Sequence, residues 1–313
     1  MAAQRMAQEL GFDETGTGGI AIAVTEASTN VLRHGGGGTL AARGITRGGR
    51  VGIEFLVVDG GPGMKSFAAS SVDGVSSAGS AGTGLGAIQR LAGEFDVYTR
   101  ESGTLIRMAF WNGPTPALES EYEIGAICVP KVGETWCGDA WEAIVDATGM
   151  TLVVADGLGH GPDAAHASGA AVETLRRHPR EPAIRLVDLI HGRLRSTRGA
   201  ALAVIRHDAG KPELAFAGVG NVAAVVLGGE NRRTMVSHNG IVGHNVHRSE
   251  EYRYPWPAHA LLVAHSDGLE SHWDLGKYPG IGQSHPSLVA ALLYREHWRQ
   301  RDDVVVVVAR HRS

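Results

Sequence analysis

The sequence contains little cysteine, no long hydrophobic run and no excess of positive charge. Its two cysteines, Cys128 and Cys137, do not form a C-x-x-C pair, so neither a disulfide framework nor a zinc ribbon is expected. No apolar stretch approaches the roughly 18 residues of a membrane span, and no signal peptide opens the chain. A net charge of −4 offers no basic surface for nucleic acid. We expect a cytoplasmic protein that binds neither nucleic acid nor a membrane.

The length of 313 residues predicts about two domains. A Gly-Pro-Thr-Pro segment after Asn112, followed by an acidic stretch, is typical of a linker. We therefore predict one domain over residues 1–112, a linker over 113–120 and a second domain over 121–313.

The first domain contains a helix on which a carboxylate and an amide are neighbours. Glu26 and Asn30 lie four residues apart, and Thr17 or Gly16 is a candidate cap for the helix. The pair is either a solvated polar face or a carboxylate base beside an amide oxygen that can bind magnesium. The helical spacing itself comes from Ile20, Val24, Ala27 and Val31.

Two glycine-rich segments follow. The strand predicted over 51–58 runs into Asp59-Gly60-Gly61-Pro62-Gly63, and a glycine loop over 81–86 precedes a helix over 87–92 and a strand closing on Gly103-Thr104. No Lys-Ser/Thr follows the loop, so it is not a Walker A motif. Glycine runs are usually flexible linkers, but one that leads into a helix can bind phosphates through backbone N–H groups.

In this order, E-x-x-x-N, D-x-G-x-G, G-x-G-x-G and G-T resemble the ATP-binding GHKL (Bergerat) fold of gyrase, Hsp90, histidine kinases and anti-sigma kinases. TEASTNVLRHGGGG, DGGPGM, residues 73–77 and GLGAIQRLAGEFDVYT are similar to RsbT-type serine kinases over residues 5–112. The resemblance implies an α/β sandwich that binds ATP and Mg²⁺, with Glu26 as general base, Asn30 as magnesium ligand and Asp59 as acceptor for the adenine amino group. The other nucleotide-binding positions that it implies are Gly61, Gly63, Gly82, Thr83, Gly84, Leu85, Gly86 and Thr104.

Two features depart from this family pattern. The strand that precedes the opening helix in the family is missing, so we expect a truncated or misassigned start. No phosphoaccepting histidine helix precedes the domain, which disfavours a histidine kinase.

In the second domain, aspartates follow or precede buried strands. Asp156 ends the apolar run 151–155 and enters a turn with Gly157, Gly159 and Gly161, which is either an ordinary connection or a ligand site. Carboxylates suit Mg²⁺ or Mn²⁺. Zinc is the alternative because the chain has 15 histidines, although none has zinc-ligand spacing. The other aspartates of this kind are Asp139, Asp267, Asp302 and Asp303.

GDAW, VADGLGHG, GVGN, SDGLES and RDDVVVVVA resemble the metal-dependent serine/threonine phosphatases of the SpoIIE (PP2C-like) family, and the short RsbX-type members in particular. The resemblance implies an α-β-β-α sandwich of two antiparallel sheets, so the whole chain is expected to be α+β. It further implies that a metal-bridging hydroxide attacks phosphoserine or phosphothreonine in line, with Asp156 and Asp267 as catalytic residues. The implied metal ligands are Asp139, Asp156, the Gly157 carbonyl, Asp267 and Asp302, with Asp303 as second choice for the last.

Three details qualify this resemblance. Val304 and Val305 follow the Asp pair, in place of the family's DD-x-T. The arginine-glycine-glycine sequence before the first Asp is reduced to Cys137-Gly138. Residues 218–221 are expected to form a turn with a packing role.

Together, the two resemblances imply a bifunctional switch protein of a partner-switching or stressosome-type pathway. It would combine an ATP-dependent serine kinase with a Mg²⁺- or Mn²⁺-dependent phosphatase, both acting on a STAS-domain anti-sigma antagonist. Two alternatives stay open: the first domain only binds ATP and sequesters a partner, or ATP occupancy regulates the phosphatase. The oligomeric state, a homodimer included, is also open.

Overall fold

The computed structural model describes residues 2–64, 84–228, 231–246 and 249–312. The chain forms two compact units, one of Met1–Ser120 with Gln283–Arg295, the other of Glu121–Gly282 with Glu296–Ser313. The predicted loop residues Gly82 and Thr83, and the stretch 73–77, lie outside the described residues.

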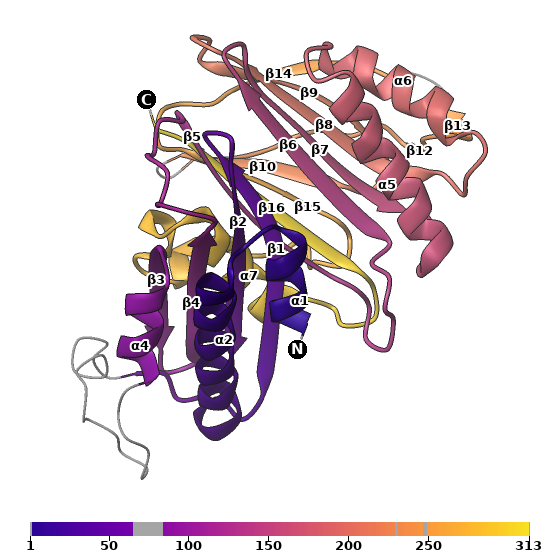
Figure 1. The fold of residues 1–313 in the computed structure, drawn as a ribbon. Helices are drawn as coiled ribbons and strands as arrows, with labels where there is room; N and C mark the ends of the chain where they lie inside the picture. The colour runs from indigo at the N-terminus through magenta and orange to yellow at the C-terminus, as the bar shows by residue number, and fades with distance from the viewer. Residues whose placement is uncertain (1, 65–83, 229–230, 247–248, 313) are drawn as a thin grey trace. The chain divides into compact units, whose positions relative to one another are not determined.

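The first unit is a four-stranded antiparallel sheet with three helices on one face (Figure 1). A cluster that includes Ile20, Ala27 and Phe55 fills the space between these helices and the sheet. In sheet order, the strands are β1 (Gly38–Arg47), β2 (Arg50–Asp59), β4 (Gly103–Trp111) and β3 (Glu94–Arg100), and the helices are α1 (Ala2–Glu9), α2 (Glu14–His34) and α4 (Gly84–Leu91). This α/β sandwich confirms the predicted class.

Three local predictions for this unit were wrong or incomplete. Asp13, rather than Thr17 or Gly16, caps α2, because its Oδ1 accepts from the Gly16 amide at 2.7 Å. Gly103 and Thr104 open β4 instead of closing the preceding strand. Strand β1 was not predicted, since it follows a glycine run and alternates between exposed and half-buried positions.

A helix from the far end of the sequence, α7 (Pro286–His297), contributes to the first unit. The Ser287 hydroxyl donates to Glu54 on β2, and the Tyr294 hydroxyl lies 3.0 Å from that of Thr39 on β1. The predicted domain ranges assigned this segment to the second domain. Its grouping with the first unit follows from side-chain contacts more than 230 residues apart in sequence, which no local pattern encodes.

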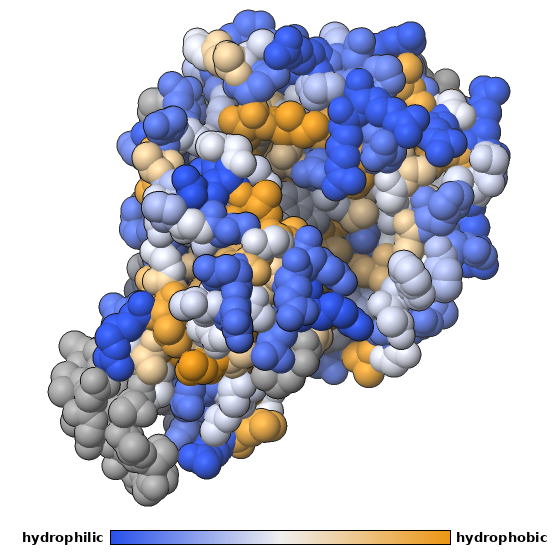
Figure 2. Space-filling model, viewed as in Figure 1, coloured by the Kyte–Doolittle hydropathy of each residue, from blue (hydrophilic) through white to orange (hydrophobic). Residues whose placement is uncertain are grey.

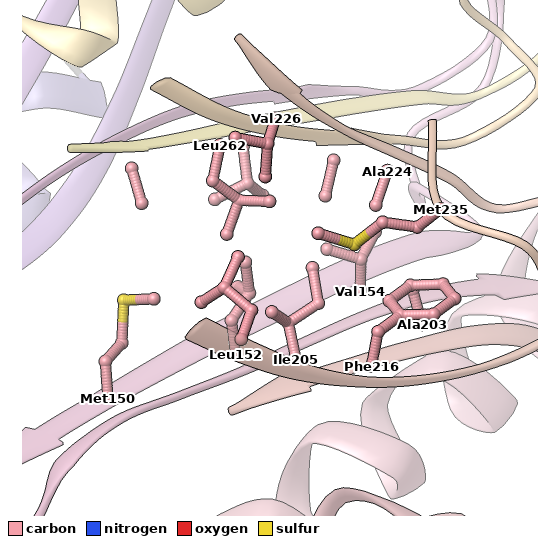
Figure 3. Close-up of a cluster of buried hydrophobic side chains, with 14 of the residues drawn as sticks. Met150, Leu152, Val154, Ala203, Ile205, Phe216, Ala224, Val226, Met235 and Leu262 are labelled. Carbon is pink, nitrogen blue, oxygen red and sulfur yellow. The ribbon is translucent and has the colours of Figure 1, made fainter. Parts of the chain in front are cut away.

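The second unit stacks two five-stranded antiparallel sheets. Their facing side chains form one core, with Leu152, Ile205 and Phe216 on one side and Val226 and Leu262 on the other (Figure 3). The first sheet is β14 (Tyr252–Pro255), β9 (Glu213–Val219), β8 (Ala200–Asp208), β7 (Gly149–Gly157) and β6 (Asp139–Asp146); the second is β11 (Asn231–Thr234), β10 (Ala223–Gly228), β15 (Leu261–His265), β16 (Val304–His311) and β5 (Tyr122–Val129).

Two helices, α5 (Pro162–Arg177) and α6 (Ala183–Leu194), cover the outer face of the β6–β9 sheet. Their alanine, leucine and valine side chains form a second core with residues such as Val153 and Leu202. The short β12 (Gly240–Ile241) and β13 (Asn245–Val246) and two 3₁₀ turns, Leu275–Lys277 and Ile281–Gln283, complete the described elements. The expected sandwich of two antiparallel sheets is confirmed.

On the face drawn in Figure 2, hydrophilic residues cover most of the surface and hydrophobic residues form separate spots. Among the described residues, no helix combines the length and the apolar character needed to cross a membrane.

Candidate functional sites

In the first unit, α2 and the start of α4 bring together three predicted nucleotide-site residues. A Cβ atom built on Gly84 would lie 3.1 Å from Glu26 Oε2 and 3.6 Å from Asn30 Nδ2. A glycine at this position therefore leaves room beside the carboxylate and the amide. Leu85 packs against the core of the unit, and Gly86 is buried within α4.

Asp59, the last residue of β2, is held by two backbone donors. Its Oδ1 accepts from the amides of Gly61 at 2.9 Å and Thr104 at 3.2 Å. These two bonds hold the carboxylate of Asp59 in one orientation. The predicted residues Asp59, Gly61 and Thr104 thus form one constellation.

The turn after Asp59 requires glycine for steric reasons. Gly63 has φ +66°, and a Cβ there would lie 1.9 Å from the Arg100 carbonyl oxygen. A Cβ on Gly61 would lie 2.5 Å from the His34 carbonyl oxygen. The D-x-G-x-G pattern therefore permits close backbone approach around Asp59.

In the second unit, the predicted aspartates gather at one end of the two sheets. Asp139 opens β6 and pairs with Asp156 near the end of β7. Asp267 follows β15, and Asp302 and Asp303 precede β16.

Burial and mutual repulsion raise the pKa of several of these carboxylates. Burial, followed by repulsion from Asp267, Asp302 and Asp303, raises the pKa of Asp156 to about 7. Burial and the charge of Asp156 raise the pKa of Asp139 well above its usual range. Burial and Asp302 also raise the pKa of Asp267, against the lowering effect of Arg299 and Arg301 (residues of the loop before β16). Repulsion between the carboxylates makes the fully ionised cluster unfavourable unless a positive charge lies nearby.

Neighbouring groups orient these carboxylates. The Ser266 hydroxyl donates to Asp139 Oδ2 at 2.6 Å and accepts from the Val305 amide at 3.1 Å. The Asn221 side-chain amide donates to Asp267 Oδ2 at 2.6 Å. Each bond restrains an oxygen in the shared region.

Asp303 differs from Asp302 in its surroundings. Its side chain is buried, and Oδ1 accepts from the Lys131 amide at 2.8 Å. Its Oδ2 is buried without a hydrogen-bond partner in the described part of the chain. A buried, unpaired carboxylate oxygen is costly unless a cation or a donor approaches it.

The donor set therefore fits a hard divalent cation. Oxygen ligands at one sheet end, mutual repulsion and an orphaned oxygen are the chemistry that Mg²⁺ or Mn²⁺ would satisfy. No group of three or more His, Cys, Asp or Glu side chains in the described ranges is already close enough to hold a metal ion. The ligand set thus stays a prediction.

Glycines let the segments around these aspartates approach closely. A Cβ on Gly157 would lie 2.1 Å from the Ala164 carbonyl oxygen, and one on Gly138 would lie 2.6 Å from Asp303 Oδ2. The Gly157 amide also donates to the Gly138 carbonyl at 3.0 Å. The Cys137-Gly138 sequence before Asp139 therefore retains a glycine at the position where close packing leaves no room for a side chain.

Two of the histidines near the aspartate motifs, His160 and His265, have hydrogen-bond partners of their own. His160 Nδ1 lies 2.7 Å from Glu134 Oε1. His265 is buried, with Nδ1 bonded to the Ser266 carbonyl and Nε2 accepting from Trp273. Both imidazoles are thus engaged away from the aspartates, which favours the carboxylate interpretation for these two residues.

Sequence reasoning missed Ser266, Asn221 and Lys131. The packing role expected for residues 218–221 holds for Gly218, where a Cβ would lie 2.6 Å from the ring of Phe216. It is incomplete for Asn221, which contacts Asp267. Ser266 and Asn221 lie within quoted motifs, but only their spatial positions identify what they do.

Comparison with known proteins agrees with both units. Residues 1–110 match the histidine kinase-like ATPase domain, and residues 146–312 match the stage II sporulation protein E (SpoIIE) family. The chain is 29% identical to the serine/threonine-protein kinase RsbT of Bacillus subtilis (strain 168) over 109 residues, which are 34% of this chain and 82% of RsbT.

The solved structures that are similar to the chain include the following two. One, described as "The bacterial stressosome: a modular system that has been adapted to control secondary messenger signaling", is 31% identical with a TM-score of 0.57, covering 61% of this chain and all of the other. The second, RsbX in complex with magnesium, is 18% identical with a TM-score of 0.55, covering 69% of this chain and 99% of RsbX.

These matches confirm the predicted arrangement of an RsbT-like ATPase domain followed by a PP2C-type phosphatase fold. Because the SpoIIE match extends over more than half of the sequence, the chain belongs to the SpoIIE family.

Proposed function

We propose that this protein is a bifunctional switch of a partner-switching or stressosome-type pathway. Its second unit removes phosphate from a phosphoserine or phosphothreonine of a STAS-domain partner, and its first unit phosphorylates the same partner from ATP. The observation that carries the proposal is the convergence of Asp139, Asp156, Asp267 and Asp302 at one end of the sandwich. A tether between opposed activities keeps both at high local concentration around one partner.

In the phosphatase unit, Asp139, Asp156, the Gly157 carbonyl, Asp267 and Asp302 would hold Mg²⁺ or Mn²⁺. Bound there, such ions neutralise the phosphate and lower the pKa of a bound water. Ser266 and Asn221 keep the Asp139 and Asp267 carboxylates oriented toward the shared region. The raised pKa of Asp156 disfavours its ionised form without a cation, so metal binding and ionisation of this carboxylate are coupled.

In the first unit, Glu26 would accept the proton of the substrate hydroxyl, and Asn30 would bind the Mg²⁺ that accompanies ATP. Support comes from the position of Gly84, which brings the start of α4 against both side chains. Asp59 Oδ2 would accept from the adenine amino group while Gly61 and Thr104 hold Oδ1.

The test uses a STAS-domain protein encoded near this gene, in serine-phosphorylated and unphosphorylated forms. With Mn²⁺ the wild type should remove the phosphate, and with ATP and Mg²⁺ it should add one. Asp156→Asn should lose the first activity, whereas Glu26→Gln should lose only the second. Asp188→Asn, an exposed substitution on α6, is the matched control. Retained phosphatase activity in Asp156→Asn would remove the metal assignment, and failure of both wild-type reactions would reject the proposal.

One observation favours a second function, regulation of the phosphatase by nucleotide. Arg295 of α7 donates from Nη1 to the backbone carbonyl of Asp59 at 3.2 Å. The side chain of Asp59 is the proposed adenine acceptor. The same helix continues through His297 into the loop that carries Asp302. Nucleotide bound at Asp59 would then bias a helix that leads to the phosphatase site.

This alternative predicts that a non-hydrolysable ATP analogue changes the dephosphorylation rate of the wild type, and that Arg295→Gln reduces the change. Glu101→Gln, in the exposed turn between β3 and β4, serves as the control. An unchanged dephosphorylation rate at a saturating concentration of the analogue would exclude regulation of the phosphatase by nucleotide.

A further inference from the structure

The two cysteines lie together although the sequence separates them by eight residues. Cys128 is on β5, where it pairs with Val305 of β16, and Cys137 lies in the loop that leads to β6. Their Sγ atoms are 3.5 Å apart, and both side chains are half-buried thiols. A disulfide needs the two sulfurs at about 2 Å, so they must approach each other by about 1.5 Å for the bond to form.

We propose that Cys128 and Cys137 form an oxidisable thiol pair that closes to an internal disulfide on exposure to a hydroperoxide. In the first step, one thiol takes an oxygen from ROOH to give a sulfenic acid and ROH. In the second, the other thiol attacks that sulfur, the S–S bond forms and water leaves. The two sulfurs together lose two electrons, the peroxide gains them, and the two thiol protons end in ROH and water. An external dithiol reverses the reaction by exchange.

The pair lies against the proposed metal site. The Cys128 thiol donates to the Asp139 carbonyl oxygen at 3.6 Å, a contact that disulfide formation removes. Cys137 is bonded to Gly138, which has no free space, since a Cβ there would lie 2.6 Å from Asp303 Oδ2 and 3.0 Å from the Ala164 Cβ.

A movement of Cys137 would therefore displace the backbone that carries Asp139. The Gly138 carbonyl also holds the Gly157 amide at 3.0 Å, so the segment after Asp156 would be disturbed as well. The disulfide itself does not depend on what the protein does, but its consequence for activity rests on the proposed phosphatase function. Changes around metal ligands typically lower metal affinity or activity by about 10- to 100-fold.

The test treats the full-length protein with hydrogen peroxide, blocks remaining thiols with an alkylating agent and maps disulfides by mass spectrometry of peptides. We expect a Cys128–Cys137 linkage in the wild type, reversed by dithiothreitol, and none in Cys128→Ser or Cys137→Ser. Absence of this linkage, or linkage only between two chains, would overturn the proposal.

The functional consequence is measured in the same samples. Oxidised wild type should lose about 10- to 100-fold in Mn²⁺ affinity by calorimetry and in para-nitrophenyl phosphate hydrolysis, and dithiothreitol should restore both. Cys128→Ser, whose hydroxyl can still donate to Asp139, should keep both after peroxide. Equal loss in Cys128→Ser would show that peroxide acts elsewhere. If the reduced wild type bound Mn²⁺ but hydrolysed no phosphoester, the phosphatase proposal would fail. The thiol-pair proposal would still be tested, by the mapped disulfide and by the Mn²⁺ affinity before and after oxidation.

Discussion

The Ser287 hydroxyl lies 2.9 and 3.0 Å from the two carboxylate oxygens of Glu54, which is almost completely buried on β2. Arg107 and Arg43 bind the same carboxylate from neighbouring strands, at 2.6 and 2.8 Å. A residue of the second predicted domain thereby completes a buried polar network on the sheet of the first unit.

Ser287→Ala should destabilise this unit. The substitution removes a hydrogen bond to a buried charged group, a loss of about 1.5–3 kcal/mol. Urea unfolding followed by tryptophan fluorescence should show the corresponding fall in midpoint. Ser28→Ala on α2 is the control and should shift the midpoint little. An unchanged midpoint in Ser287→Ala would mean that α7 contributes no stability through this contact.

The Glu54 network should also make stability depend on pH. Burial alone would raise the pKa of Glu54, but the charges of Arg43, Arg107 and His285 lower it from 4.5 to about 2. Because the pKa is lower in the folded state, the stabilisation is fully present above about pH 4.5 and is lost as the pH falls toward 2.

Between these pH values the wild type should lose on the order of 3 kcal/mol more than Glu54→Gln, in which no group titrates at this position. Taking the difference between the unfolding free energies of the two proteins at each pH cancels the contribution of the other carboxylates, which both proteins share. Parallel pH profiles for the two proteins would contradict this origin of the acid sensitivity.

The two adjacent aspartates should differ as metal ligands. Asp302 raises the pKa of both Asp156 and Asp267, whereas Asp303 raises the pKa of Asp156 and Asp139, and the family resemblance makes Asp302 the first choice as ligand. We expect Asp302→Asn to reduce Mn²⁺ affinity by at least about 10-fold. Asp303→Asn should reduce it less, since its remaining carbonyl oxygen can still accept from the Lys131 amide. Calorimetric titration with Mn²⁺ measures the affinity of both variants. A larger loss of affinity in Asp303→Asn than in Asp302→Asn would identify Asp303 as the ligand.

Ser266→Ala should weaken metal binding without removing a ligand. Asp139 would lose a 2.6 Å hydrogen bond, and the Val305 amide would lose its acceptor. Partners of this kind contribute about 10- to 100-fold to metal affinity. Ser266→Thr keeps the hydroxyl and should retain more of the affinity than the alanine variant. Equal affinity in all three proteins would show that this bond does not position Asp139.

Asp59→Asn should weaken ATP binding and leave the fold intact. The Asn carbonyl can still accept from Gly61 and Thr104, but an amide NH₂ replaces the oxygen that would accept from adenine. Loss of such a bond corresponds to about 1–3 kcal/mol, or roughly 5- to 150-fold in affinity. Fluorescent-nucleotide titration measures it, with Glu101→Gln as control. Unchanged affinity would exclude Asp59 as the adenine acceptor.

The sequence alone determined the local features. Alternating or continuous apolar runs identified β2, β7, β15 and β16, and glycine patterns after Asp59 and Asp156 marked turns where a Cβ would collide with backbone. The motifs predicted an ATPase domain followed by a two-sheet phosphatase domain through their resemblance to known families, because their residues and their order in the chain carry that resemblance.

The tertiary structure decided what depends on contacts between distant segments. It assigned α7 to the first unit, brought Ser266 and Asn221 to the aspartates and placed Cys128 beside Cys137. Strand β1 also escaped prediction, since its pairing with β2 rather than its own weak pattern defines it. Such contacts join residues from 9 to 255 positions apart. Their free energy depends on burial and on partners from distant segments, which local propensity does not encode.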